Sequence, residues 1–219
     1  DSSASVDGGA DELVVEGSAH SGISVLSGTT SQGSIYFGDS GDNNIAGIVY
    51  NHNNNNLTLR SGGLNTMNMD GTGAVTMPQQ PMFVSHITST VSNVTGDETT
   101  YTIIADTDIL DRNADHNVSN GTFTAPVTGV YGFFSAISFS GIASNHTRIM
   151  LTHVTSNRTY YPVQTLSYDN SFSAGMSFST MVVADMDASD THVFNVRVDG
   201  GSAVIDVDDV GRYGGWLIG

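Results

Sequence analysis

The feature that most constrains the fold is the alternation of short apolar runs with turn residues along the whole chain. Runs rich in β-branched and aromatic side chains end repeatedly in Gly, Asn or Asp. No window of useful length shows the 3.6-residue apolar period of a helix. β-Branched and aromatic residues suit a pleated sheet, whereas Gly, Asn and Asp suit turns. The sequence therefore predicts an all-β protein.

The N-terminal part, residues 1–77, contains only very short apolar runs. Strands this short bury too little surface to be stable alone, so we expect the segment to stack on itself or on copies from other chains. The Asn-rich run at 51–56 is expected to be a loop, because Asn tolerates left-handed backbone. The expected strands lie within 13–17, 23–28, 35–42, 45–51, 57–63, 67–73 and 74–77.

A domain boundary is predicted at MPQQP, 77–81, which holds two of the four prolines. Proline stiffens a linker, so we place a short linker at 78–81 between two domains, 1–77 and 82–219. The number of strands expected after the linker suits a two-sheet sandwich or jelly roll. These strands lie at 82–87, 100–104, 121–124, 129–140, 147–154, 159–166, 172–184, 191–198, 202–206 and 213–218.

The stretch FTAPVTGVYGFF, 123–134, places a turn directly before a long apolar strand. Pro126 fixes φ and cannot donate to a ladder, so it is expected at a sheet corner. Gly129 is expected to permit a tight backbone at the turn. Tyr131 and Phe133 fall on one face of the strand and are expected to pack in the core. The stretch is thus interpreted as architectural.

With its neighbours, this stretch resembles the globular head of complement 1q, a branch of the tumour-necrosis-factor superfamily. Phe123, Pro126, Gly129, Tyr131 and Phe133 stand at the matching positions, and GRYGGWLIG, which contains Trp216, resembles the last strands of that head. The resemblance covers about residues 82–219. It implies a jelly-roll head that assembles as a homotrimer.

The N-terminal part has a resemblance of its own, to the shaft segments of tailed-virus fibres and tailspikes. The residues that carry it are 35–42, 47–59 and 67–75. This resemblance implies a short intertwined β shaft, triple-stranded or β-prism-like, in which three chains supply one another's packing partners.

The charge balance excludes several partners. The chain has 22 acidic and 6 basic residues, and all six bases are arginine. Nucleic acids and anionic membranes require clustered basic residues, so neither is expected as a partner, and no apolar run is long enough for membrane insertion. The Asp-rich, lysine-free composition resembles that of extreme halophiles, and it predicts loss of stability below about 0.5 M salt, where self-repulsion is no longer screened. The alternative is an acidic composition unrelated to salt.

No motif predicts an enzyme. GDSG at 38–41 matches the active-serine motif of trypsin-like proteases, but that chemistry needs a histidine base and an orienting aspartate, and only His20 lies upstream. We interpret these residues as a turn. Paired carboxylates could serve glycoside hydrolysis, but acidic residues are so plentiful here that pairs carry little information.

The densest acidic cluster is IDVDDVG, with Asp206, Asp208 and Asp209. Calcium binds several carboxylate oxygens, so one interpretation is a structural site for Ca²⁺ or a similar cation. The other is a solvated acidic loop. No other cofactor is predicted.

Loops on a rigid scaffold commonly carry recognition, so receptor binding is expected in the loops of the head at 141–147, 155–159, 167–172 and 185–191. Their tyrosines could stack on sugars, and ordinary packing within strands is the alternative for them. The predicted binding residues are Asn145, Tyr160, Tyr161, Tyr168, Asp169 and Asn170.

These observations lead to one leading hypothesis. The chain is expected to be a homotrimeric fibre or spike on the surface of a virion, in a high-salt environment, that contacts other virion proteins. Its head would attach to a glycan or protein receptor on the host cell. The alternatives are a purely structural virion decoration, turret or trimerisation cap, and a secreted complement-like binding protein.

Overall fold

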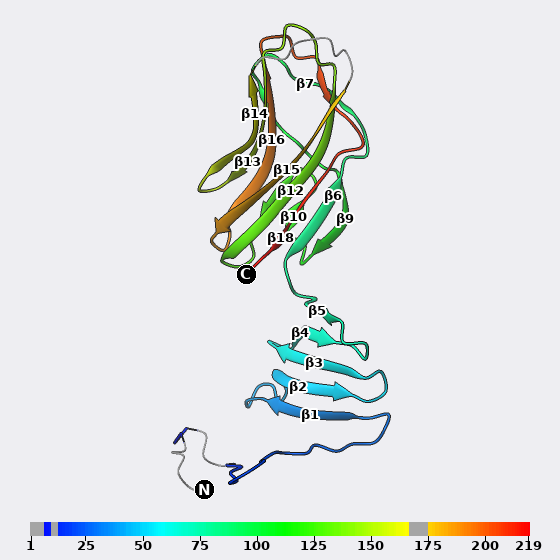
Figure 1. The fold of residues 1–219 in the computed structure, drawn as a ribbon, viewed down its shortest axis with the longest axis vertical. Coiled ribbons are helices and arrows are strands. Elements are labelled where there is room, and N and C mark those ends of the chain that lie inside the picture. Colours follow the sequence, from blue (N-terminus) through cyan, green and yellow to red (C-terminus); the bar gives the residue numbers. More distant parts are fainter. Residues whose placement is uncertain (1–6, 10–12, 167–174) are drawn as a thin grey trace. The chain divides into compact units, whose positions relative to one another are not determined.

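The computed structural model describes residues 7–9, 13–166 and 175–219, and every regular element within them is a β-strand (Figure 1). The prediction of an all-β chain is therefore confirmed. The chain divides into two compact units, Asp1–Pro78 and Gln79–Gly219. None of the described segments forms a helix with the length and apolar character needed to cross a membrane.

The first unit is one antiparallel sheet in which the strands pair in chain order (Figure 1). The turn at 52–55 joins β2 to β3, and Asn55 adopts φ of +54°, the left-handed conformation that Asn tolerates. The loop predicted in this Asn-rich run is confirmed, although Asn51 and Asn56 at its ends belong to the strands and pair with each other. The strands are β1 (Gln32–Phe37), β2 (Ala46–Asn51), β3 (Asn56–Ser61), β4 (Leu64–Met69) and β5 (Val75–Thr76).

Two strand predictions in this unit are wrong. LVVEG at 13–17 and ISVLSG at 23–28 have the composition of strands, yet the structure assigns no strand to either. A strand needs a hydrogen-bonded neighbour, and neither run pairs with the sheet that starts at Gln32. A segment with the composition of a strand therefore does not form one unless another strand lies beside it to share hydrogen bonds.

The second unit is a sandwich of two antiparallel sheets. One sheet has the order β10-β11-β16-β13-β14, with β8 also on β16. The other has the order β7-β17-β12-β18-β6-β9, with β15 on the second edge of β12. The chain crosses repeatedly from one sheet to the other, for example from β11 to β12, from β12 to β13 and from β14 to β15, as in a jelly roll. The predicted sandwich is therefore confirmed.

The strands of the first of these sheets are β8 (Thr100–Thr102), β10 (His116–Asn117), β11 (Thr122–Thr124), β13 (Arg148–Thr155), β14 (Thr159–Leu166) and β16 (Thr191–Asp199). Those of the second are β6 (Met82–His86), β7 (Val91–Thr95), β9 (Thr107–Arg112), β12 (Gly129–Ser140), β15 (Met176–Met186), β17 (Ile205–Val207) and β18 (Arg212–Leu217).

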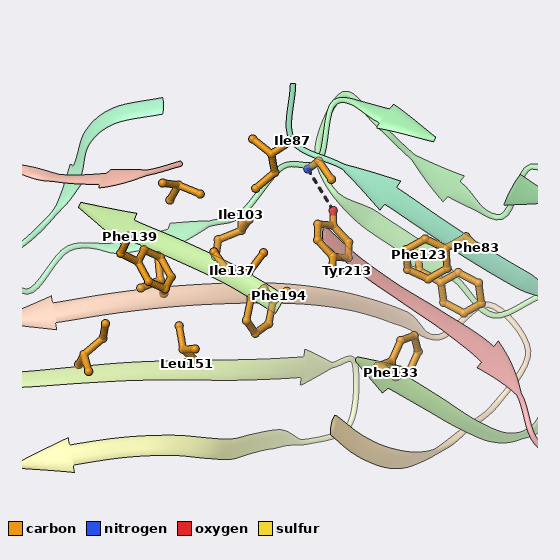
Figure 2. Close-up of a cluster of buried hydrophobic side chains, with 14 of the residues drawn as sticks. Phe83, Ile87, Ile103, Phe123, Phe133, Ile137, Phe139, Leu151, Phe194 and Tyr213 are labelled. Atoms are coloured by element: carbon orange, nitrogen blue, oxygen red, sulfur yellow. Dashed lines mark hydrogen bonds between the residues drawn. The ribbon is translucent and has the colours of Figure 1, made fainter. Parts of the chain in front are cut away.

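The core of the sandwich lies between the sheets and is rich in aromatic side chains (Figure 2). Phe133 and Tyr131 on β12 are fully buried, and Phe123 on β11 packs against both. Burial of large aromatic side chains contributes strongly to the hydrophobic stabilisation of such a core. The expectation that these three residues are architectural agrees with their places in the core.

The turn before β12 is held differently from the prediction. Pro126 is exposed in the bend, and the Tyr131 hydroxyl donates a 2.7 Å hydrogen bond to the Val127 carbonyl, which ties the bend to the strand. Gly129 does not have a positive φ. A Cβ there would meet Leu217 Cδ1 at 2.7 Å and the Gly219 oxygen at 3.0 Å. Glycine is favoured at this position because another segment approaches closely, and not because the turn needs left-handed backbone.

Candidate functional site

Two buried polar networks cross the core of the sandwich, and each could be mistaken for catalytic machinery. In the first, His116 Nδ1 lies 2.8 Å from the Asp108 carboxylate and 3.0 Å from Ser85 Oγ, and Ser85 also donates to Asp108. His116 Nε2 lies 3.1 Å from the Tyr213 hydroxyl. Burial raises the pKa of this tyrosine, so it stays protonated.

This network does not have the arrangement of a serine hydrolase. A catalytic histidine takes the serine proton on one ring nitrogen and is held by the aspartate through the other. Here Ser85 and Asp108 both contact the same nitrogen, and Ser85 is fully buried. The network therefore satisfies polar groups inside the core.

The second network links the two sheets. His153 on β13 forms hydrogen bonds with His192 on β16, at 2.9 Å, and with Thr180 on β15, at 2.7 Å. Thr180 in turn lies 2.5 Å from Ser135 on β12. His192 stacks on Phe133 with the ring centres 3.7 Å apart, and its Nδ1 is buried without a partner.

Both histidines are held neutral by their surroundings. Burial lowers the pKa of His153 to about 4, and burial followed by the neighbouring His153 and His116 lowers the pKa of His192 well below its usual value. Protonation of either ring would place a charge inside the core. The pair therefore makes the stability of the sandwich depend on pH.

The sequence carried a signal for this pair. His153 alternates with Leu151 and Thr155, and His192 alternates with Phe194 and Val196, and all of these are buried. A histidine on the apolar face of an alternating strand is expected inside the sheet sandwich. That the two rings meet depends on the register between β13 and β16, which pairs Thr155 with His192 and His153 with Phe194.

Two of the residues predicted to bind a metal accept hydrogen bonds from the protein, and the third is exposed in a turn. Asp206 accepts a 2.8 Å hydrogen bond from the Asn93 backbone, and Asp208 accepts one of 2.6 Å from Ser140. Asp209 is exposed in the turn before β18. Across the described residues, no group of three or more His, Cys, Asp or Glu side chains is arranged to hold a metal ion.

The predicted binding residues fall in different places. Asn145 lies in the exposed loop between β12 and β13, whereas Tyr160 and Tyr161 are successive residues of β14. Successive residues of a strand point to opposite faces, and only Tyr160 packs partly against the core. Tyr168, Asp169 and Asn170 lie outside the described residues.

Tyr160 lines a cleft of about 440 Å³ that the sequence did not single out. The other lining residues come from three separate segments, the start of β12, the end of β15 and the β13–β14 turn: Val130, Asn157, Arg158, Val183 and Asp185. Since these segments are distant in sequence, only the pairing of strands brings them together.

A broad apolar surface lies on the outer face of the seven-stranded sheet. Cross-strand neighbours on this face are Phe134 with Met181, and Gly132 with both Val183 and Trp216. Met181 and Val183 are 58% and 53% exposed. Large contiguous apolar patches on a soluble protein commonly mark interaction surfaces.

The sheet of the first unit has one apolar face and one mixed face, on which polar side chains surround the buried Val49. Ile35, Ile48, Leu59 and Met67 occupy successive strands in register and form an apolar row. Ser34, Val49, Thr58 and Asn68 form the matching row on the other face. Val25 lies against this face beside Gly33, but Ile35, Ile48 and Leu59 are still between 39% and 46% exposed, so the described chain covers the apolar face only in part.

The residues of GDSG form the turn after β1. The Asp39 carboxylate accepts hydrogen bonds from the Gly41 and Asp42 backbone, at 2.7 and 3.0 Å. These bonds, chiefly the one from Asp42, lower the pKa of Asp39. The Asp39 carboxylate therefore stabilises the turn that was predicted for these residues.

No protein-family model matches the chain, and no curated protein matches its sequence. Solved structures that are similar to it include complement-1q-like and tumour-necrosis-factor-like jelly-roll domains. The globular domain of zebrafish complement 1qA is 17% identical, with 64% of this chain and 98% of that chain covered and a TM-score of 0.45. Murine APRIL is 12% identical, with 64% and 99% covered and a TM-score of 0.44. Eiger TNF from S. frugiperda is 14% identical, with 64% and 94% covered and a TM-score of 0.44.

Proposed function

We propose that the chain is a homotrimeric fibre or spike of a virion surface, with residues 1–77 as the shaft and 82–219 as a jelly-roll head that attaches to a host receptor. The observation that carries the proposal is the apolar face of the β1–β5 sheet. A single sheet with one exposed apolar face is only marginally stable in water, so another layer must cover it.

Three copies can provide that layer. If three such sheets turn their apolar faces toward a common axis, the row Ile35–Ile48–Leu59–Met67 of each chain is covered by those of the other two. The polar row that contains Thr58 then faces water. The outer apolar face of the head, with Phe134, Met181 and Trp216, supports self-association of the second unit as well.

The head supplies the attachment function in this proposal. It has a closed core, and its loops and the Tyr160 cleft are free to contact a ligand. Three weak sites on one trimer would bind a cell surface with raised avidity. No enzymatic step is assigned to the protein, because the Ser85–His116–Asp108 network is buried and lacks the hydrolase arrangement.

Light scattering on the full chain tests the assembly. We expect a mass of three chains, and we expect Leu59→Asp to reduce it to one. Thr58→Asp is the matched control, because Thr58 lies next to Leu59 on the opposite face of β3 and should keep the trimer. A monomeric wild-type protein, or equal effects of the two substitutions, would contradict the proposal.

The jelly-roll topology of residues 79–219 favours a second candidate, a secreted complement-like binding protein. Saturable binding of the purified trimer to candidate host cells, with competition against virus adsorption, is expected for a virion protein. Binding to cells without such competition, together with absence of the protein from purified particles, would favour the secreted candidate.

A further inference from the structure

The cleft lined by Tyr160 combines an apolar wall with charged and polar groups. Val130 and Val183 come from the outer face of the β12–β15 pair, where Val130 lies opposite Asp185. Asn157 and Arg158 come from the turn before β14. The volume of about 440 Å³ falls within the range of small-molecule sites.

Three polar groups in this cleft are not used by the protein itself. Among the described residues, the Arg158 guanidinium, the Tyr160 hydroxyl and the Asp185 carboxylate take part in no hydrogen bond or ion pair. The guanidinium carbon lies 6.0 Å from the centre of the Tyr160 ring, a distance typical of a weak cation–π contact. Arg158 and Asp185 line the same cleft without pairing. They are therefore available to a ligand that presents both acceptors and donors.

Hydrogen bonds within the protein hold the backbone of the polar wall and the Asn157 side chain. The Thr155 amide donates to the Arg158 carbonyl at 2.8 Å, and the Arg158 amide donates to Thr155 Oγ1 at 3.1 Å. Asn157 Nδ2 donates to the Asp190 carboxylate at 2.6 Å, and the same carboxylate oxygen accepts from the Asp187 amide at 2.9 Å. The backbone therefore loses little conformational entropy when a ligand binds, and the ordering cost falls mainly on the Arg158 and Asp185 side chains.

The chemistry of the wall selects a class of ligand. A sugar ring has an apolar C–H face that packs on an aromatic ring, and hydroxyls that both donate and accept hydrogen bonds. The apolar face of the sugar can pack on Tyr160, Val130 and Val183. Its hydroxyls can form hydrogen bonds with Asp185, Arg158 and the Asn157 amide. The Arg158 and Asp185 charges offset each other, and the chain has a net charge of −16, which repels anionic ligands.

We propose that this cleft binds a neutral saccharide, whose ring packs on Tyr160 and whose hydroxyls bond Arg158 and Asp185. The inference rests on the proposed attachment function, and it narrows the receptor to a neutral glycan and the contact to one cleft. It also distinguishes Tyr160 from Tyr161, which lies beside it in β14 but does not line the cleft.

Saturation-transfer NMR on the full-length protein tests the proposal. The probes are the methyl glycosides of glucose, galactose, mannose and N-acetylglucosamine, with N-acetylneuraminic acid as the acidic probe. We expect binding of at least one neutral glycoside, with Kd on the order of 1 mM. Arg158→Ala and Asp185→Asn should each weaken it about tenfold or more, which is the effect expected for loss of a hydrogen bond to a charged group.

Two control variants lie outside the cleft. Arg212→Ala removes an exposed arginine of β18, and Tyr161→Phe removes the hydroxyl of the neighbouring tyrosine. Both should bind the glycoside as the wild type does. No binding of any neutral glycoside by the folded protein, binding of the acidic probe alone, or equal loss in the control variants would overturn the proposal.

Mass and cell binding measured on the same samples separate this inference from the proposed function. A trimer that binds host cells but no neutral glycoside contradicts only the saccharide site. A change from trimer to monomer in Arg158→Ala would show that the cleft is a contact between subunits, and this also overturns the saccharide site. A wild-type protein that neither forms trimers nor binds cells contradicts the proposed function itself.

Discussion

The two units of this chain use the same alternating pattern of side chains but bury it to different extents. In the sandwich, the inward residues of β12 meet a second sheet from the same chain, and Tyr131 and Phe133 have no exposed surface. In the β1–β5 sheet, Ile35 and Ile48 are 46% and 43% exposed. The head thus completes a core within one chain, whereas the β1–β5 sheet leaves apolar side chains partly exposed, and in the proposed trimer further copies would cover them.

The largest expected effect lies in the head. Phe133→Ala should destabilise it by about 3–5 kcal/mol, because it removes a buried ring that contacts Phe123 and His192. Denaturant unfolding followed by near-ultraviolet circular dichroism would measure it. Since the core is built within one chain, the loss should not depend on protein concentration. A loss of stability that depends on protein concentration would show that the head does not complete its core within one chain.

Acid between pH 7 and pH 4 should destabilise the head more than the β1–β5 sheet. His153 has a folded pKa of about 4, below the value near 6.5 of an unfolded histidine, so the unfolded chain binds the proton more readily. Stability is therefore full above about pH 6.5 and falls as the pH drops toward 4, by about 3 kcal/mol for this group. His192 acts in the same direction.

Thermal unfolding between pH 7 and pH 4 would measure the effect, and His153→Gln should flatten the profile over this range. In the first unit His20 and His52 are not buried, so its transition should show no corresponding shift. An acid-induced loss confined to that unit would be the opposite of the expected result.

A smaller effect is expected for Ile48→Ala in the β1–β5 sheet. In an isolated chain the change should be close to zero, because Ile48 is already partly exposed. In the assembled protein it should cost about 2 kcal/mol per chain, the order expected for truncating an isoleucine that partners cover. Sedimentation equilibrium of the wild type and the variant would measure the difference, and an equal cost at all concentrations would show that the sheet is complete on its own.

The smallest effect is expected at the turn between β2 and β3. Asn55 has φ of +54°, where glycine is free of the steric penalty of a Cβ. Asn55→Gly should therefore change stability by only a few tenths of a kcal/mol, because Asn already tolerates this conformation. Asn55→Val should be clearly destabilising, because a β-branched residue does not tolerate this positive φ. Differential scanning calorimetry of the two variants would measure both effects.

The sequence predicted a strand correctly where the residue types of the segment favour a strand and the segment also has hydrogen-bonded neighbours in the sheet. The strand at 129–140 was predicted with its observed bounds, because Pro126 ends the preceding strand and a long aromatic run follows. The strands at 91–95 and 107–112 were not predicted. The second of these, TDILDR, lies at the edge of its sheet and pairs only with β6, so polar residues are tolerated along it.

The candidate site was less predictable than the fold. From the sequence, Tyr160 and Tyr161 were both predicted to bind. The structure distinguishes them, because they are successive residues of β14 and only Tyr160 lines the cleft. Arg158 and Asp185 lie in loops that were predicted to bind, 155–159 and 185–191, but neither residue was named, and Val130 was not predicted. These residues join Tyr160 only through the pairing of β12 with β15 and the position of the β13–β14 turn. The binding role of all these residues stays a prediction.

The place of β18 in its sheet has a consequence for how the protein is made. β18 lies between β6 and β12, where Trp216 pairs with Met82 and Gly132. During translation, β6 and β12 leave the ribosome long before their common neighbour exists, and this non-local pairing must wait for it. The head is therefore expected to close only after β18 has been synthesised, and a chain stopped before Arg212 would keep both strand edges open to aggregation.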